Sequence, residues 1–275
     1  MKSTIVFPHC PKTGGTTLKE RYRTNNKDFV VTDLGDEVDT QTKVIFGHTA
    51  HIGGYEKLIN NLIYVTCLRD PIDRMMSMYN FYKTQLHYMN PDVGDIDFYL
   101  WFINKDVIRP MNVTKQYEYY LYQHVDHTDW FDRGILADPS SVNDMFSNTV
   151  LTWDVDKDIS SVNIELLQKR VINKNKIERQ NMNITWKNVM QRFDHVLFQD
   201  QNIVNEFDKL LNDYDLELTP WREMRVTNET KYDLHKHNLK YTRFSDLDDD
   251  LQYLVRLDLQ NDIEFYTRCA DRWKH

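Results

Sequence analysis

Residues suited to holding a phosphate or sulfate group stand within the first twenty positions of the chain. The segment His9-Cys10-Pro11-Lys12-Thr13-Gly14-Gly15-Thr16-Thr17 follows a short apolar run and precedes a helix-forming stretch. This order predicts a strand, a glycine-bearing turn and a helix whose first N–H groups have no intrahelical partner. Those N–H groups, the helix dipole and the Lys12 ammonium favour an anion there. Further hydroxyl donors come from Thr13, Thr16 and Thr17.

This lysine loop is not a Walker A motif. That motif needs a glycine, four residues and then Gly-Lys-Ser/Thr, whereas here Lys12 precedes the pair Gly14-Gly15 and no glycine stands upstream. The loop therefore suits an anionic group without implying the Mg-nucleotide geometry of a P-loop NTPase. By itself it is equally compatible with an ordinary strand-to-helix turn that carries a surface lysine.

A second strand-to-helix junction carries an arginine and a serine. Residues 62–68 form a nearly continuous apolar run, which is typical of a strand buried in a parallel sheet. Arg69 stands where this strand ends. Asp70 is a good N-cap and Pro71 a natural first helical residue, so a helix is expected to begin there.

Within that helix Arg74 and Ser77 are three residues apart and share a face. Together with Arg69 they can converge near the carboxyl end of the strand, where guanidinium and hydroxyl groups suit a phosphate monoester. The alternative is that Arg74 pairs with Asp70 on a solvated helix face and that Ser77 faces water.

Taken together, the two junctions resemble the sulfotransferase superfamily. Pro11–Thr17 is similar to the 5′-phosphosulfate loop of that superfamily, and Arg69–Tyr79 is similar to its 3′-phosphate motif. The pattern is closest to the carbohydrate branch typified by heparan sulfate 2-O-sulfotransferases. The resemblance covers residues 3–82, with a looser similarity in the last eighty residues.

The resemblance implies 3′-phosphoadenosine 5′-phosphosulfate (PAPS) as the sulfuryl donor and adenosine 3′,5′-bisphosphate (PAP) as a product. It assigns Lys12 to the phosphosulfate and its bridging oxygen, and Arg69 and Ser77 to the 3′-phosphate. The 5′-phosphate would be held by the N–H groups and hydroxyls of the loop, that is by Thr13, Gly14, Gly15, Thr16 and Thr17. This scheme requires no metal.

The candidate general base is His48, which follows a predicted strand ending at Gly47. Histidine titrates near neutral pH and is the commonest general base. In the carbohydrate branch a histidine at this Gly-His position is the proposed base, and another stands two residues earlier, where this chain has Phe46. His51 is the possible substitute, although a loop histidine without a catalytic role is the simpler interpretation of that residue.

The order of elements predicts the fold class. Strands at 29–32, 43–46, 62–68 and 195–198 alternate with helices at 15–24, 71–87 and 201–213, which favours a parallel α/β sheet. Further helical patterns lie near 96–104, 116–125, 161–173, 185–193, 246–256 and 258–273. We therefore expect an α/β, P-loop-like parallel sheet flanked by helices, in a single domain spanning 1–275 with a helix-rich C-terminal half.

Charge and composition limit the partners. The net charge is −8 and the pI about 5.7, which argues against a nucleic-acid or anionic-membrane binder. Residues 222–243 run against this trend, and a basic loop in this part of sulfotransferases covers the 3′-phosphate and adenine; a solvated basic loop is the alternative. No signal peptide or membrane-length apolar stretch is seen, so a cytoplasmic location is expected.

The sequence thus predicts a sulfotransferase that moves a sulfuryl group from PAPS to the hydroxyl of an acceptor, with a saccharide as the expected acceptor class. Lys12 and His48 are the expected catalytic residues. Two alternatives stay open. One is a Mg-dependent small-molecule or nucleotide kinase, and the other is a non-catalytic nucleotide-binding protein with the same fold.

Overall fold

The computed structural model describes residues 3–89, 96–104, 115–121, 164–221 and 234–274. Within them lies one five-stranded sheet, in the order β2-β3-β1-β4-β5, and every strand pair is parallel. β1 is central, and its Ile5 lies opposite Val44 of β3 and Ile63 of β4. The strands are β1 Thr4–Pro8, β2 Phe29–Val31, β3 Val44–Gly47, β4 Leu62–Leu68 and β5 His195–Phe198.

The strand order creates a switch point at β1. After β1 the chain builds β2 and β3 on one side of it and then crosses to build β4 and β5 on the other side. In sheets of this kind ligands bind beyond the carboxyl ends of the strands, where the order reverses. This places the expected site beyond the end of β1, between the ends of β3 and β4.

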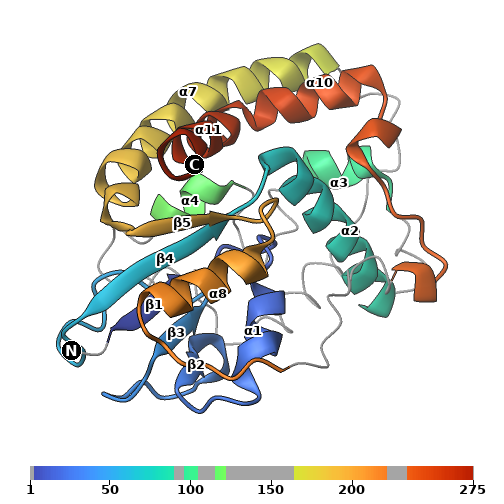
Figure 1. Cartoon of the computed structure of the whole chain (residues 1–275). Helices are drawn as coiled ribbons and strands as arrows, with labels where there is room; N and C mark the ends of the chain where they lie inside the picture. Colours follow the sequence, from blue (N-terminus) through green and yellow to red (C-terminus); the bar gives the residue numbers. More distant parts are fainter. Residues whose placement is uncertain (1–2, 90–95, 105–114, 122–163, 222–233, 275) are drawn as a thin grey trace.

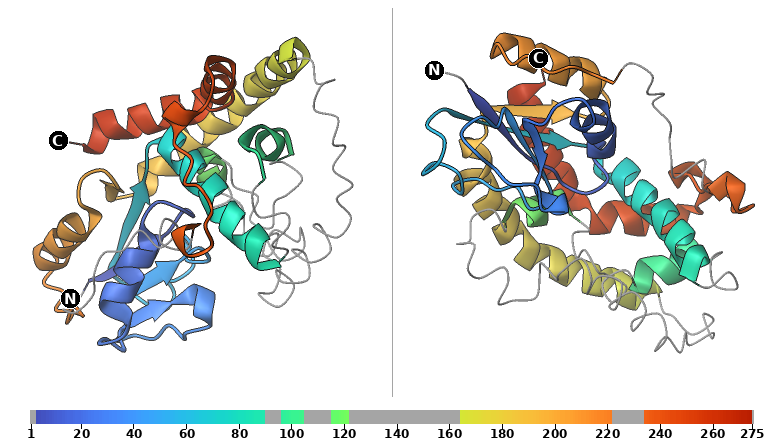
Figure 2. Two further views of the ribbon diagram at one scale, coloured as in Figure 1. Left: turned by 90° about the vertical axis from the view of Figure 1, so that its right-hand side faces the viewer. Right: turned by 90° about the horizontal axis from the view of Figure 1, so that it is seen from below.

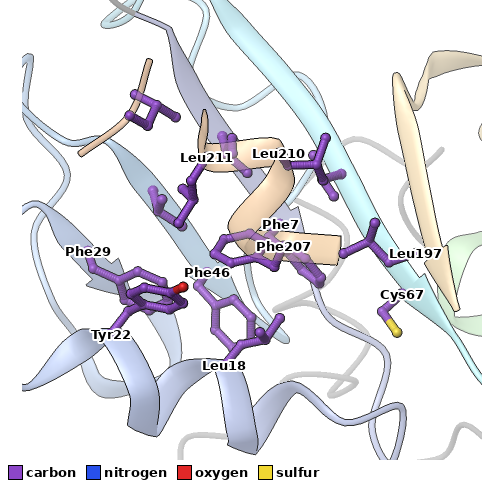
Figure 3. Packing of buried hydrophobic residues seen from close by; sticks show 14 of the residues in the cluster. Phe7, Leu18, Tyr22, Phe29, Phe46, Cys67, Leu197, Phe207, Leu210 and Leu211 are labelled. Carbon is purple, nitrogen blue, oxygen red and sulfur yellow. The ribbon is translucent and has the colours of Figure 1, made fainter. Parts of the chain in front are cut away.

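Two helices cover one face of the sheet, α1 (Gly15–Arg23) and α8 (Ile203–Asp213). Because successive strand residues point to opposite faces, Ile5 and Phe7 of β1 face this layer, whereas Val6 packs on the other side. Figure 3 shows Phe7 and Phe46 from the strands meeting Leu18 and Tyr22 of α1 and Phe207 of α8. This packed layer fixes the start of α1, which the lysine loop enters.

The other face is covered by α4 (Gln116–Leu121), α7 (Ile164–Asn188) and α11 (Gln260–Trp273). A further apolar cluster joins α2 (Pro71–Met89), α3 (Phe98–Asn104) and α10 (Asp249–Asp258). Figures 1 and 2 show α7, α10 and α11 together on the side of the sheet away from α8. The described residues also contain three short 3-10 helices, η1 Thr32–Leu34, η4 Met190–Arg192 and η5 Phe244–Asp246.

The structure confirms the predicted α/β class, with a parallel sheet flanked by helices and a helix-rich C-terminal half. One prediction is wrong: the two helical patterns at 161–173 and 185–193 belong largely to the single helix α7, followed by η4. The asparagines between them are weak helix formers, but tertiary contacts outweigh that preference. The Asn175 side chain donates to Leu257 O at 2.6 Å, and the backbone carbonyl of Asn175 accepts from the Asn261 side chain at 2.9 Å.

α7 is 25 residues long, but its composition is largely polar. Within the described ranges no helix combines the length and the apolar character needed to cross a membrane. Part of the predicted pattern at 116–125, the first two residues of the chain and residues 222–233 of the basic region lie outside the described residues.

Candidate functional site

The three chemistry-bearing segments meet at the carboxyl edge of the sheet. They follow β1, β3 and β4, which are adjacent strands. Arg69, just after β4, donates from Nη1 to the carbonyl oxygen of Lys12 at 3.4 Å. The ring of His48, just after β3, stacks on the ring of His9 with centroids 4.7 Å apart. The structure therefore brings the two predicted anion sites and the predicted base together.

The lysine loop presents its charge toward α2. The Lys12 ammonium nitrogen lies 4.3 Å from the centroid of the Phe81 ring, a cation–π distance. Phe81 is one helical turn beyond Ser77 on the same face of α2. The backbone of Lys12 is left-handed, with φ at 67°, a costly conformation for a residue with a side chain and one that recurs at functional sites.

The three threonines of the loop have different positions. Thr13 is fully buried, and its hydroxyl donates to Cys10 O at 2.8 Å, so this side chain braces the loop from inside. The prediction that the Thr13 hydroxyl faces a ligand therefore does not match the structure. Thr16 is exposed and Thr17 is half-buried on the first turn of α1, where hydroxyl groups can reach a bound anion.

The two loop glycines are required for different reasons. Gly14 caps α1 in a left-handed conformation with φ at 98°. Gly15 donates its N–H to Nε2 of His9 at 2.9 Å, and a Cβ added at Gly15 would lie only 2.2 Å from that nitrogen. The N–H of Gly15 is thus bound within the protein. The prediction that it holds the donor does not match the structure, which leaves the rest of the loop and the first turn of α1 for that role.

Arg69 is held by a side chain from a distant helix. The buried amide of Gln116 accepts from Arg69 N at 2.9 Å and donates to Arg69 O at 2.8 Å, as a neighbouring strand would. Asp262 of α11 in turn accepts the backbone N–H groups of Gln116 at 2.7 Å and Tyr117 at 3.2 Å. This chain of contacts fixes the backbone from which the Arg69 side chain leaves the sheet.

The Arg69 guanidinium is half-buried and incompletely paired. Its buried Nε has no hydrogen-bond partner among the described residues. Burial lowers the pKa of Arg69 from its usual value, and the nearby carboxylate of Asp73 opposes that effect. Arginine still carries its charge at neutral pH. A buried cationic donor with an open position is a site at which an anionic oxygen would be stabilised.

The start of α2 follows the predicted pattern. The Asp70 carboxylate accepts from Ile72 N at 2.9 Å and Asp73 N at 3.0 Å, and the helix begins at Pro71. Arg74 does not lie on a solvated face, because it is fully buried and its Nε donates to Pro11 O at 2.9 Å. That alternative interpretation of Arg74 is wrong, and the residue instead joins α2 to the lysine loop.

Ser77 lies on the face of α2 that contacts the loop. It is 9% exposed and stands between Arg74 and Phe81, each about one helical turn away and each in contact with the loop. Its small side chain therefore faces the same region as Arg69 and Lys12. That Arg69 and Ser77 hold one phosphate stays a prediction.

The ring and both backbone polar groups of His48 form hydrogen bonds. Its Nδ1 lies 2.5 Å from the carbonyl oxygen of His9. Because a carbonyl can only accept, Nδ1 carries the proton, and the neutral ring keeps a lone pair on Nε2. The backbone N–H of His48 donates to the Asp33 carboxylate at 2.9 Å, and the backbone carbonyl of His48 accepts from the Tyr119 hydroxyl at 3.0 Å. The geometry thus presets one ring nitrogen as a base.

The turn before His48 requires a glycine. Gly47 has φ at 148°, and an added Cβ would lie 2.5 Å from the Thr32 hydroxyl and 2.9 Å from the Asp33 carboxylate. The same carboxylate accepts the N–H of Thr49 at 2.9 Å. The Gly-His pair is therefore a tight turn capped by Asp33, which follows β2.

His51, the other candidate base, packs elsewhere on the same loop. Its ring stacks on Tyr55 with centroids 5.0 Å apart, and its Nδ1 lies 3.0 Å from Thr49 O. Burial lowers the pKa of His51. These contacts account for the residue as part of the loop packing, which is the simpler of the two interpretations.

The described end of the basic region lies along α2. Asn80 donates to Thr242 O at 2.8 Å and accepts from Thr242 N at 2.9 Å. Lys83 donates to Lys240 O at 3.0 Å. Tyr241 lies near enough to Arg69 to influence the pKa of its guanidinium. Residues 240–242 therefore run along α2 near Arg69. That the basic region covers the 3′-phosphate and adenine stays a prediction.

Three residues that position the site were missed in the sequence: His9, Asp33 and Gln116. His9 stands at the edge of the lysine loop, and its nearness to the two glycines is the only local sign of its role. Asp33 and Gln116 act on residues 15 and 47 positions away. No local pattern connects such pairs.

No protein-family model matches the chain, and no curated protein sequence matches it at a significant level. Among the residues that the structure describes, no three His, Cys, Asp or Glu side chains are grouped as ligands of a metal ion would be. The geometry of the site and the two motifs are therefore the observations that bear on function.

Proposed function

We propose that the protein is a PAPS-dependent sulfotransferase that acts on a hydroxyl group, with a saccharide as the acceptor class. The observation that carries the proposal is the direct contact between the two anion sites. Arg69 donates to the backbone of Lys12, and Arg74 donates to that of Pro11, so the sites are joined by hydrogen bonds at the end of β1. One nucleotide with two anionic groups suits such a pair.

The residues present fit this donor. Lys12 and the first turn of α1 offer a charge, hydroxyls and N–H groups to the phosphosulfate end. Arg69, whose Nε has an open position among the described residues, and Ser77 offer a guanidinium and a hydroxyl to the 3′-phosphate end. The acidic net charge of −8 does not oppose this, because Lys12, Arg69 and Arg74 bring positive groups together at the site.

The chemistry follows from the position of His48. The donor supplies an activated sulfuryl group, and the acceptor oxygen forms the new S–O bond as the bond to the bridging oxygen breaks. His48 Nε2 takes the proton from the acceptor hydroxyl, and its Nδ1–H remains bonded to His9 O, which stabilises the imidazolium. Lys12 and the loop N–H groups stabilise the charge that develops on the departing oxygen.

A labelled-donor assay tests the proposal. The protein is incubated with ³⁵S-PAPS and a panel of glycans, phenols and small alcohols, in EDTA, and the products are identified by mass spectrometry. We expect sulfation of a glycan hydroxyl in EDTA and its loss in Lys12→Ala. Transfer of phosphate from ATP that depends on Mg²⁺, with no sulfation, would show a kinase instead. Binding of PAP without transfer to any acceptor would indicate a non-catalytic protein.

A further inference from the structure

We propose that His9 is a positioning residue that couples the base to the donor loop, so that the two are placed as one unit. This inference rests on the proposed function and assigns a role to a residue that the motifs do not. His9 directly follows β1 and is 4% exposed, so it lies beneath the site rather than on its surface.

The ring of His9 holds the beginning of α1. Its Nε2 accepts the N–H of Gly15 at 2.9 Å, which requires a lone pair on Nε2 and places the proton of the neutral ring on Nδ1. The fit leaves no space for a side chain at Gly15, because a Cβ there would overlap the imidazole. The His9 ring thus accepts the first N–H group of α1 and thereby fixes the direction of the other N–H groups in the first turn.

The same residue holds the base. The carbonyl oxygen of His9 lies 2.5 Å from His48 Nδ1, and the two rings stack with an interplanar angle of 27°. The Phe46 ring also stacks on the His9 ring, with centroids 5.4 Å apart. A displacement of His9 therefore moves the lysine loop and the His48 ring together.

The surroundings keep the His9 ring neutral. Burial is the main cause of the lowered pKa of His9. The electrostatic influence of four basic residues near the ring, His48, Lys19, Arg74 and Lys12, acts in the same direction. A protonated ring would place an N–H against the Gly15 N–H and lose the bond. At neutral pH the ring therefore remains an acceptor.

Two substitutions separate the acceptor from the shape of the ring. His9→Phe keeps a ring for stacking but cannot accept from Gly15, whereas His9→Gln places an amide oxygen close to the position of Nε2. PAP affinity is measured by calorimetry, turnover by the ³⁵S assay, and folding by thermal unfolding. We expect His9→Phe to lose about tenfold in both PAP affinity and kcat, and His9→Gln to recover the affinity to within about threefold.

A spectroscopic measurement on the unmodified protein tests the hydrogen bonds of the two rings independently of the variants. Proton–nitrogen correlation spectra of the imidazoles should show both His9 and His48 protonated on Nδ1. The opposite tautomer at His9, or unchanged PAP affinity in a folded His9→Phe protein that still loses PAP on Lys12→Ala, would overturn the positioning role alone. If the unmodified protein binds no PAP, the proposed function fails, and the tautomers still test the link between His9 and Gly15.

Discussion

The two halves of the site differ in how completely their side chains are held. On the histidine side, the backbone N–H of His48 donates to Asp33 and its carbonyl accepts from Tyr119. The His48 ring is bonded to the carbonyl of His9. On the cationic side, Arg69 reaches the Lys12 carbonyl through a long 3.4 Å contact and leaves its Nε without a partner among the described residues.

Under the proposed function, this difference separates the group that is oriented before the acceptor binds from the groups whose hydrogen bonds the donor would complete. A base must be oriented before the acceptor arrives, because proton transfer depends on geometry over a few tenths of an ångström. Cations that bind an anion gain from being incompletely paired, since the ligand then supplies the missing hydrogen bonds. The fixed histidine and the incompletely paired arginine therefore suit two different tasks, proton transfer and donor binding.

Replacing His48 by alanine should have the largest effect and should affect only one half of the site. We expect His48→Ala to lower kcat by about a thousandfold, within the range of general-base contributions, and to leave PAP affinity within about twofold. Steady-state kinetics at saturating donor and calorimetry measure the two quantities. Full turnover in His48→Ala would mean that another group is the base.

Removing the amide that holds Arg69 should have an intermediate effect, on the cationic half. Gln116→Leu leaves the Arg69 N–H and carbonyl without their partners, and we expect about a tenfold loss of PAP affinity and a lower melting temperature. Gln252→Leu is the matched control, because that amide belongs to α10 and bonds to Leu247 O. Equal losses of PAP affinity in both variants would show that Gln116 does not act through Arg69.

The smallest effect on the site is expected from Asp262→Asn, which tests the support beneath Gln116. Burial raises the pKa of Asp262 to about 6. In the unfolded chain the Asp262 carboxyl therefore loses its proton at a lower pH than in the folded protein. As a result the free energy of unfolding falls as the pH rises from about 4 to 6, by up to about 3 kcal/mol. Asparagine keeps the oxygen that accepts from Gln116 and Tyr117 and removes this slope.

Thermal unfolding of the unmodified protein and of Asp262→Asn across pH 4 to 7 measures the slope. We expect the unmodified protein to lose stability relative to the variant as the pH increases, with little change in PAP affinity. A difference between the two proteins that does not vary with pH would contradict the raised pKa.

Local patterns predicted the elements of this molecule and the junctions between them. The apolar run of β4, the Asp70 cap and Pro71 specified a strand and a helix start, and the structure has both. The same reasoning placed His48 after a strand ending at Gly47. Each of these features depends on neighbouring residues, so the sequence contains the information directly.

Features that depend on distant contacts could not be predicted. Asn175 is a weak helix former, yet α7 continues through it because its amide bonds to Leu257. Arg74 had two interpretations until the fold placed Pro11 O within 2.9 Å of its Nε. The roles of His9 and Gln116 also required the three-dimensional arrangement, since each donates or accepts across the site.

The most direct test of the central claim is to ask whether one nucleotide bridges both anion sites. Calorimetry would compare PAP with adenosine 5′-phosphate, which lacks the 3′-phosphate, in the unmodified protein, Lys12→Ala and Arg69→Ala. We expect Lys12→Ala to weaken both nucleotides, and Arg69→Ala to weaken PAP by about tenfold or more while leaving adenosine 5′-phosphate unchanged. Equal effects of Arg69→Ala on both nucleotides, or on neither, would contradict the account.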